Sequence, residues 1–161
     1  MDRLIADKEM LIMSQNRQIL DDIAERIQAI VNAETASVVL AESEGETVYY
    51  AAAIGKHAEW VLDKRVAAAT SGLCGTAFQS DKPVLVCRTE GDRRVRQDHA
   101  KALGIETALA VSLYYEGKLL GALQAWNRND GSLFDEEAER VLAAYASEVA
   151  PLVYQYQTTM K

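Results

Sequence analysis

The stretch ETALAVSLYYEGKLLGALQAWN, residues 106–127, constrains the fold more than any other part of the chain. Two runs rich in aliphatic, β-branched and aromatic residues flank the pair Glu116 and Gly117. A two-residue connection of this kind joins neighbouring strands of an antiparallel sheet. The sequence therefore predicts a β-hairpin here, and with it an antiparallel sheet.

A second hairpin is predicted between residues 36–41 and 47–54, where β-branched and aromatic runs lie on both sides of the turn sequence SEGE. Gly45 supplies the flexible position of that turn. Residues 83–87, PVLVC, predict one shorter strand.

Residues 1–32 contain no glycine or proline, and isoleucines recur at spacings of three, four and seven, which predicts a long amphipathic helix. Its first half carries further apolar residues, namely Leu4, Ile5, Met10, Leu11 and Met13. This is more apolar surface than one domain needs at a chain end. Either a second chain covers it, or the helix folds back on its own domain.

A second helix is predicted over residues 135–158. Asp135 is placed to cap it, and Glu136 and Glu137 follow in the first turn, where the helix dipole favours negative charge. Pro151 lies within the apolar pattern, so it either kinks the helix or ends it near Ala150.

The order of these elements predicts an α+β domain, in which the terminal helices cover one face of an antiparallel sheet and residues 55–104 cover the other. The 161 residues, 49% of them hydrophobic, fit one compact domain. We expect a single domain over residues 1–161, with an N-terminal helix at 1–32, the sheet and pocket segment at 35–134, and a C-terminal helix at 135–158.

The formal net charge of -7 argues against nucleic acid or an anionic membrane surface as a partner. Two cysteines and the absence of a secretory or membrane-spanning pattern predict a cytoplasmic domain without a disulfide framework. His57 and His99 have no metal-ligand spacing to either cysteine, so no metal site is expected.

With these elements placed, residues 19–148 resemble the GAF domain family. The resemblance rests on five stretches in the right order, which are ILDDIAERIQAIVNAETASVVLAE, SGLCGTAFQSDKPVLV, DRRV, ALGIETALAVSL and GKLLGALQAWNRNDGSLFDEEAERVLAAYA. It implies a GAF/PAS-like sheet and a regulatory module, in which a small molecule or chromophore held between the sheet and the central segment biases the terminal helices. It further implies a homodimer joined through those helices, a separate or fused output domain, and no enzymatic activity. The main alternative is a dimerisation module without a ligand.

Cys74 lies between two glycines in SGLCGTAF, residues 71–78. In one interpretation, Ser71 caps a short helix whose first turn lowers the thiol pKa below its free value of about 8.5 and makes the thiol reactive. In the other, which we favour, a small residue is needed where the helix meets the sheet or the ligand.

The resemblance also bears on ligands. Bilin-binding members attach the chromophore through a cysteine that is commonly followed by histidine, and Gly75 follows Cys74 here, which argues against covalent bilin. A branch of the family reduces free methionine sulfoxide with several cysteines, so Cys74 and Cys87 keep a thiol reductase open as an alternative.

Cyclic-nucleotide-binding members carry an Asn-Lys, a later Phe and then an Asp-Glu pair. Asn127-Arg128 and Phe134 stand in similar places, but Ala138-Glu139 replaces the acidic pair. Cyclic nucleotide therefore stays open as a ligand, and we expect Asn127 to hold a strand end by hydrogen bonds.

The segment CRTEGDRRVRQDHAKALG, residues 87–104, is locally basic in an acidic chain. Arginines near a cavity would clamp a carboxylate or phosphate, whereas the alternative is a solvated surface with ion pairs. Aromatic residues, among them Trp126, are candidates for the pocket wall. The predicted pocket residues are Tyr50, Trp60, Cys74, Arg88, Arg93, Arg94 and His99.

Overall fold

The computed structural model describes residues 2–80 and 82–159, with the backbone alone for residues 2–5 and 12–14. Six strands form one sheet in the order β3-β2-β1-β6-β5-β4, and every neighbouring pair is antiparallel. The strands are β1 (Ala33–Glu42), β2 (Thr47–Gly55), β3 (Arg65–Ala67), β4 (Val84–Val86), β5 (Ala108–Tyr115) and β6 (Lys118–Arg128).

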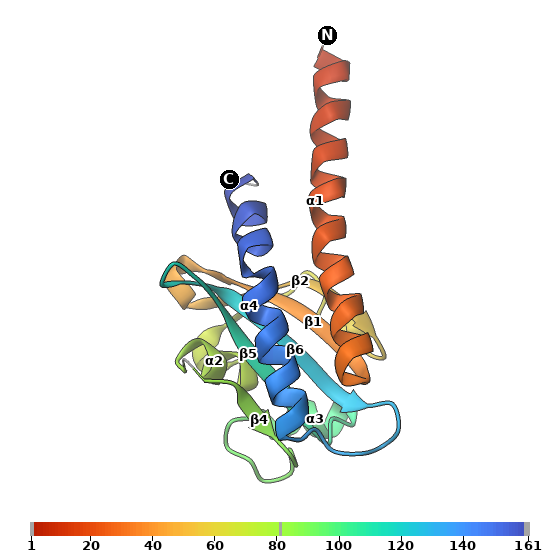
Figure 1. The fold of residues 1–161 in the computed structure, drawn as a ribbon, viewed down its shortest axis with the longest axis vertical. Coiled ribbons are helices and arrows are strands. Elements are labelled where there is room, and N and C mark those ends of the chain that lie inside the picture. Colours follow the sequence, from red (N-terminus) through yellow and green to blue (C-terminus); the bar gives the residue numbers. More distant parts are fainter. Residues whose placement is uncertain (1, 81, 160–161) are drawn as a thin grey trace.

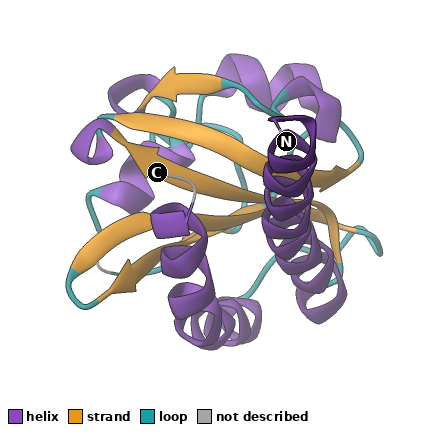
Figure 2. Cartoon of the chain, turned by 90° about the horizontal axis from the view of Figure 1, so that it is seen from above, coloured by secondary structure: helices purple, strands orange, loops and turns teal. Residues whose placement is uncertain are grey.

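Two long helices, α1 (Asp2–Val31) and α4 (Glu136–Thr159), cover one face of the sheet, and α2 (Leu73–Phe78) and α3 (Gln97–Leu103) lie on the other (Figures 1 and 2). Short 3-10 turns at Ser43–Gly45, Ala58–Trp60 and Ala68–Thr70 complete the fold. The predicted α+β architecture is confirmed.

Both predicted hairpins are present. Glu116 and Gly117 have φ angles of 50° and 79°, as a two-residue turn between twisted antiparallel strands requires. The first hairpin begins at Ala33 rather than at residue 36. The edge strand β3 was not predicted, because three residues are too few to show a periodicity.

The sheet buries a separate apolar cluster on each face. Val38 and Leu40 face the long helices, whereas Val39 between them faces the short helices. On β2, Tyr50 lies in the cluster under the short helices, and Tyr49 packs against the cluster under α1 and α4. Alternation along the strand therefore places one aromatic side chain on each side of the sheet.

The C-terminal half of α1 packs on the sheet through Leu20, Ile23 and Ile27, each at most 3% exposed. Its N-terminal half extends past the sheet (Figure 1), where Met10 and Leu11 are 68% and 58% exposed. The alternative that the start of the helix folds back on its own domain is therefore wrong for Met10 and Leu11. The other apolar side chains predicted there, Leu4, Ile5 and Met13, lie outside the described side chains.

Helix α4 begins as predicted, since the backbone N–H of Ala138 donates to Asp135 Oδ1 at 2.9 Å. The prediction that Pro151 could end the helix near Ala150 is wrong, because α4 continues to Thr159. Pro151 and Ser147 are both exposed, so the carbonyl oxygen that loses its N–H partner can be hydrated.

Candidate functional site

A pocket in two adjoining parts lies between the sheet and the segment 58–105; we call it the central pocket. Its outer part has a volume of about 270 Å³ and its inner part about 60 Å³. The inner part reaches the sheet at Ala108, Gln124 and Trp126. The residues that line both parts are Tyr50, Val61, Ser71, Arg96, His99 and Leu103.

The strand register explains why space remains above the sheet. Gln124 lies opposite Ser37 on β1 and Ala110 on β5, and Trp126 lies opposite Ala108. Residues directly opposite in an antiparallel ladder project from the same face. Small side chains therefore flank Gln124 and Trp126, and they leave the inner part of the pocket unfilled.

The roof of the pocket depends on glycine at two places. A Cβ on Gly75 would lie 1.9 Å from the carbonyl oxygen of Ala68, so only glycine lets α2 pack this closely against the preceding turn. Gly72 has a φ of 75° and is the N-cap residue of α2. The predicted cap by Ser71 is wrong, because its hydroxyl donates instead to the Ala68 carbonyl at 3.1 Å.

Cys74 is fully buried on α2. Burial raises the pKa of its thiol to about 12, although the hydrogen bond with Tyr50 acts in the opposite direction. The interpretation that the helix start lowers this pKa is therefore wrong, because desolvation by burial raises it. Cys87 is exposed, and neither cysteine forms a disulfide.

A buried chain of hydrogen bonds orients Gln124, which is 3% exposed. The Tyr50 hydroxyl lies 3.9 Å from Cys74 Sγ, and Sγ donates to Gln124 Oε1 at 3.0 Å. Ser37 Oγ also donates to Oε1, at 3.3 Å. The amide nitrogen Nε2 makes no hydrogen bond with any residue that the structure describes. Gln124 lines the inner part of the pocket, and Nε2 is not among the fully buried unpaired atoms of the described residues, so this donor is accessible from the cavity.

The sequence interpretation missed Gln124. The one signal available was a single polar residue within the apolar run LLGALQAW. A strand residue of this kind can face water or a cavity, and only the covering of that face by α2 and α3 decides between the two.

Basic and aromatic side chains form the mouth of the pocket. Trp60 is 56% exposed there and lies with Lys64, Arg96 and His99 around the outer part. The loop that carries Trp60 is held to β2, since Tyr50 donates its backbone N–H to the Lys64 carbonyl at 2.9 Å. Arg96 also pairs with Asp98 at 2.9 Å, on the solvent side.

The structure brings only some of the predicted pocket residues together. Tyr50, Trp60 and His99 line the central pocket, and Cys74 contacts it through Tyr50 and Gln124. Of the neighbouring arginines, Arg96 lines the central pocket, and the predicted Arg93 and Arg94 do not. Arg94 forms a bidentate ion pair with Asp92, at 2.6 and 3.0 Å. Arg93 lines none of the described cavities, whereas Arg96 lines both parts of the central pocket.

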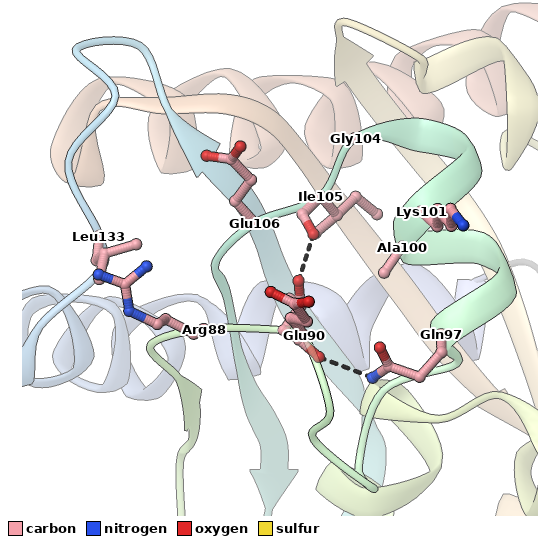
Figure 3. A pocket seen from close by; sticks show the side chains of 10 residues that line it. Arg88, Glu90, Gln97, Ala100, Lys101, Gly104, Ile105, Glu106 and Leu133 are labelled. Atoms are coloured by element: carbon pink, nitrogen blue, oxygen red, sulfur yellow. Dashed lines mark hydrogen bonds between the residues drawn. The ribbon is translucent and has the colours of Figure 1, made fainter.

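Arg88 lines a different cavity, of about 540 Å³, on the other side of α3 (Figure 3). In Figure 3, Arg88 extends toward Leu133, Lys101 lies on α3, and Glu90 and Glu106 lie between them. The two carboxylates offset the two cations. Because this cavity is wide, polar and lined mostly by exposed residues, it would leave a small ligand largely hydrated.

The family model of the GAF domain matches residues 16–153. The chain belongs to the GAF domain family. GAF domains are sensory and regulatory domains for the most part, and this chain is a domain of that class. No curated protein sequence matches it significantly.

Solved structures share the fold at low sequence identity. A GAF domain/HD domain protein from Geobacter sulfurreducens has a TM-score of 0.75 and 13% identity, over 91% of this chain and 96% of that one. The GAF domain of an Acinetobacter phosphoenolpyruvate-protein phosphotransferase has a TM-score of 0.74 and 18% identity, over 89% and 85%. A type II free methionine-R-sulfoxide reductase from Thermoplasma acidophilum has a TM-score of 0.72 and 17% identity, over 89% and 96%.

Residues 2–80 and 82–159 contain no cluster of three or more His, Cys, Asp or Glu side chains suited to a metal ion. Among the helices described there, none is both long enough and apolar enough to cross a membrane.

Asn127, near the end of β6, makes hydrogen bonds to the backbone of residues 104–107. Its Oδ1 accepts from the backbone N–H groups of Glu106 (2.8 Å) and Thr107 (3.3 Å), and its Nδ2 donates to the Gly104 carbonyl (2.9 Å). The expectation that Asn127 is a structural hydrogen bonder is confirmed. It ties the segment after α3 to the end of β6.

We therefore predict that Asn127→Ala raises amide hydrogen exchange in residues 104–107 by about tenfold, because three hydrogen bonds to that segment are lost. Hydrogen exchange with mass spectrometry measures this. Asn129→Ala is the matched control: Asn129 bonds Asn32 and Ala33 instead, so exchange in 104–107 should not change. Equal effects of the two variants would contradict the assigned role.

We also predict that native protein at pH 8 reacts with iodoacetamide at Cys87 and that Cys74 stays protected. The thiolate is the reacting form, and Cys74 is buried with a pKa of about 12, so it is protonated and inaccessible at pH 8. Peptide mass spectrometry locates the label, and denatured protein, in which both thiols react, is the control. Native labelling of Cys74 as fast as Cys87 would revive the reactive-thiol interpretation.

Proposed function

We propose that this GAF domain is a sensor that binds a small molecule in the central pocket and passes the change through α1 and α4 as a homodimer, without catalysing a reaction. The observation that carries the proposal is the Gln124 amide, whose Nε2 makes no hydrogen bond to the described residues and is accessible from the pocket. A donor that opens into a cavity can pair with an acceptor atom of a ligand there.

Two connections would link the pocket to the long helices. The first runs along the rim, where Asp63, next to Lys64, pairs with Arg17 of α1 at 2.8 Å. The second runs through the sheet, since Gln124 of β6 lines the pocket and accepts a hydrogen bond from Ser37 of β1. Their neighbours Val38 and Leu123 pack into the cluster under α1 and α4. A ligand changes the helices only if it binds one arrangement more tightly than the other.

The homodimer is proposed from the free helix surfaces. The start of α1 and the end of α4 extend past the sheet at the same end of the molecule (Figure 1). Met10 and Leu11 of α1 are exposed there, at 68% and 58%. Leu152 of α4, next to the buried Val153, is 46% exposed. Two copies would bury these side chains in a bundle of helices, whose register is an element able to switch. An output domain, fused or separate, would join at that end.

The surroundings of Cys74 argue against two of the functions that the family resemblance left open. Cys74 lies behind Tyr50 and Gln124 with a protonated thiol, which argues against both covalent bilin attachment and a nucleophilic role in a methionine sulfoxide reductase. Cyclic nucleotide stays open, and so does a dimerisation module with no ligand. The following two experiments separate these alternatives.

Thermal unfolding with fractions of a bacterial metabolite extract tests ligand binding. A ligand at a hundred times its Kd stabilises the folded state by about 2.7 kcal/mol, which for a domain of this size raises Tm by roughly 5–10 °C. We expect Trp60→Ala at the mouth to reduce that rise, and Leu62→Ala to leave it unchanged, because Leu62 is exposed and lines none of the described cavities. No rise with any fraction would favour the dimerisation module.

Light scattering tests the dimer. We expect a mass twice the 17.7 kDa of one chain, and we expect Met10→Glu to shift it toward 17.7 kDa, because a charge would have to be buried in the helical bundle. Lys8→Glu, also a charge change on the exposed part of α1, is the control and should leave the mass unchanged. A monomer in the unmodified protein contradicts the proposal.

A further inference from the structure

We infer that the ligand of the central pocket is a small organic anion with a second hydrogen-bond acceptor: the acceptor meets Gln124 Nε2, and the negative charge lies against Arg96, His99 and Lys64. The inference rests on the proposed sensor function and goes beyond it by naming the class of ligand.

The acceptor follows from the orientation of the Gln124 amide. Cys74 and Ser37 both donate to Oε1, so two donors occupy this oxygen. The single thiol hydrogen of Cys74 is used in that bond, which leaves the Tyr50 hydroxyl to donate to the sulfur. The opposite amide group then presents only N–H donors to the pocket. A carbonyl oxygen, a hydroxyl oxygen or a ring nitrogen can accept from it, whereas an ammonium group cannot.

The charge follows from the lining of the mouth. Lys64, Arg96 and His99 line the outer part, and none of the described residues that line either part is acidic, although the chain has a formal net charge of -7. Asp98 pairs with Arg96, but it is not among the lining residues, so guanidinium N–H groups of Arg96 stay available to a ligand. Charges of one sign in a cleft with apolar walls concentrate the opposite charge.

The size and shape follow from the walls. Between its two polar ends the pocket is bounded by the side chains of Tyr50, Val61, Leu103 and Trp126. Its outer volume, about 270 Å³, is at or below the lower end of the range of roughly 300–1,000 Å³ that drug-sized ligands occupy. The ligand is therefore a small acid with a short apolar body rather than a large chromophore.

The test uses two matched series of probes. The first is nicotinate, which has both a charge and a ring acceptor, with benzoate lacking the acceptor and nicotinamide lacking the charge. The second is 4-oxopentanoate, pentanoate and 4-oxopentanamide. Titrations of ¹⁵N-labelled protein followed by NMR give each Kd and report directly on the Gln124 side-chain amide.

We expect nicotinate or 4-oxopentanoate to bind at least about fivefold more tightly than both other compounds of its series, which is the gain expected for one further hydrogen bond. The acid that binds should also shift the NMR resonances of Gln124 Nε2. Equal or tighter binding by the neutral compounds overturns the inference, and so does the absence of binding in both series. If metabolite fractions still stabilise the protein in that case, the ligand class is wrong and the sensor function stands; if they do not, both fail.

Variants locate the two contacts. Arg96→Gln should weaken binding of the acids about tenfold and leave the neutral compounds unchanged, because it removes a hydrogen bond to a charged group. Arg93→Gln is the control, because it is the same substitution at an arginine that lines none of the described cavities.

Gln124→Met should remove the preference for an acceptor. Gln124→Met leaves Ser37 and Cys74 without their acceptor, so the Tm of this variant is measured to check that it folds. If Gln124→Met unfolds, Arg96→Gln still tests the inference. Equal affinity in Arg96→Gln and the unmodified protein overturns the anion assignment.

Discussion

The antiparallel pairing of β1 with β6 at the middle of the sheet is the constraint on which the rest of the structure depends. One register places Val38 opposite Leu123 beneath the long helices and Ser37 opposite Gln124 beneath the short ones. A slip by one residue would exchange the two faces and bury the wrong side chains on each. The core that carries α1 and α4 and the floor of the pocket are therefore set by the same ladder.

The two faces of that sheet are covered in different ways, and the difference accounts for the site. Long helices bury aliphatic side chains such as Leu20 and Leu142 completely. The short helix α2 instead contacts the sheet through the small side chain of Cys74, and the floor beneath carries Ser37, Ala108 and Ala110. Small residues at a close approach leave a cavity, and one buried amide then gives that cavity a polar end. A site of this kind offers a ligand one donor and a basic mouth.

Several elements of this protein could be predicted from local patterns, and others could not. Turn residues and apolar periodicity predicted both hairpins and both long helices, and Asp135 was correctly placed as a cap. Which of the neighbouring arginines lines the pocket could not be predicted, because in the loop before α3 the direction of each side chain depends on backbone angles that no periodicity reveals. Arg94 turns to Asp92, whereas Arg96 turns to the pocket.

The sequence by itself determined the α+β class, the antiparallel hairpins and the amphipathic ends, because these depend on contacts between residues close in the chain. Only the tertiary structure decided the chemistry of the site. The pKa of Cys74 rises because distant segments exclude water from it, and Gln124 becomes a pocket donor because Ser37, 87 positions away, and Cys74, 50 positions away, occupy its oxygen. Burial and hydrogen-bond partners across such separations are properties of the folded chain, and no local pattern contains them.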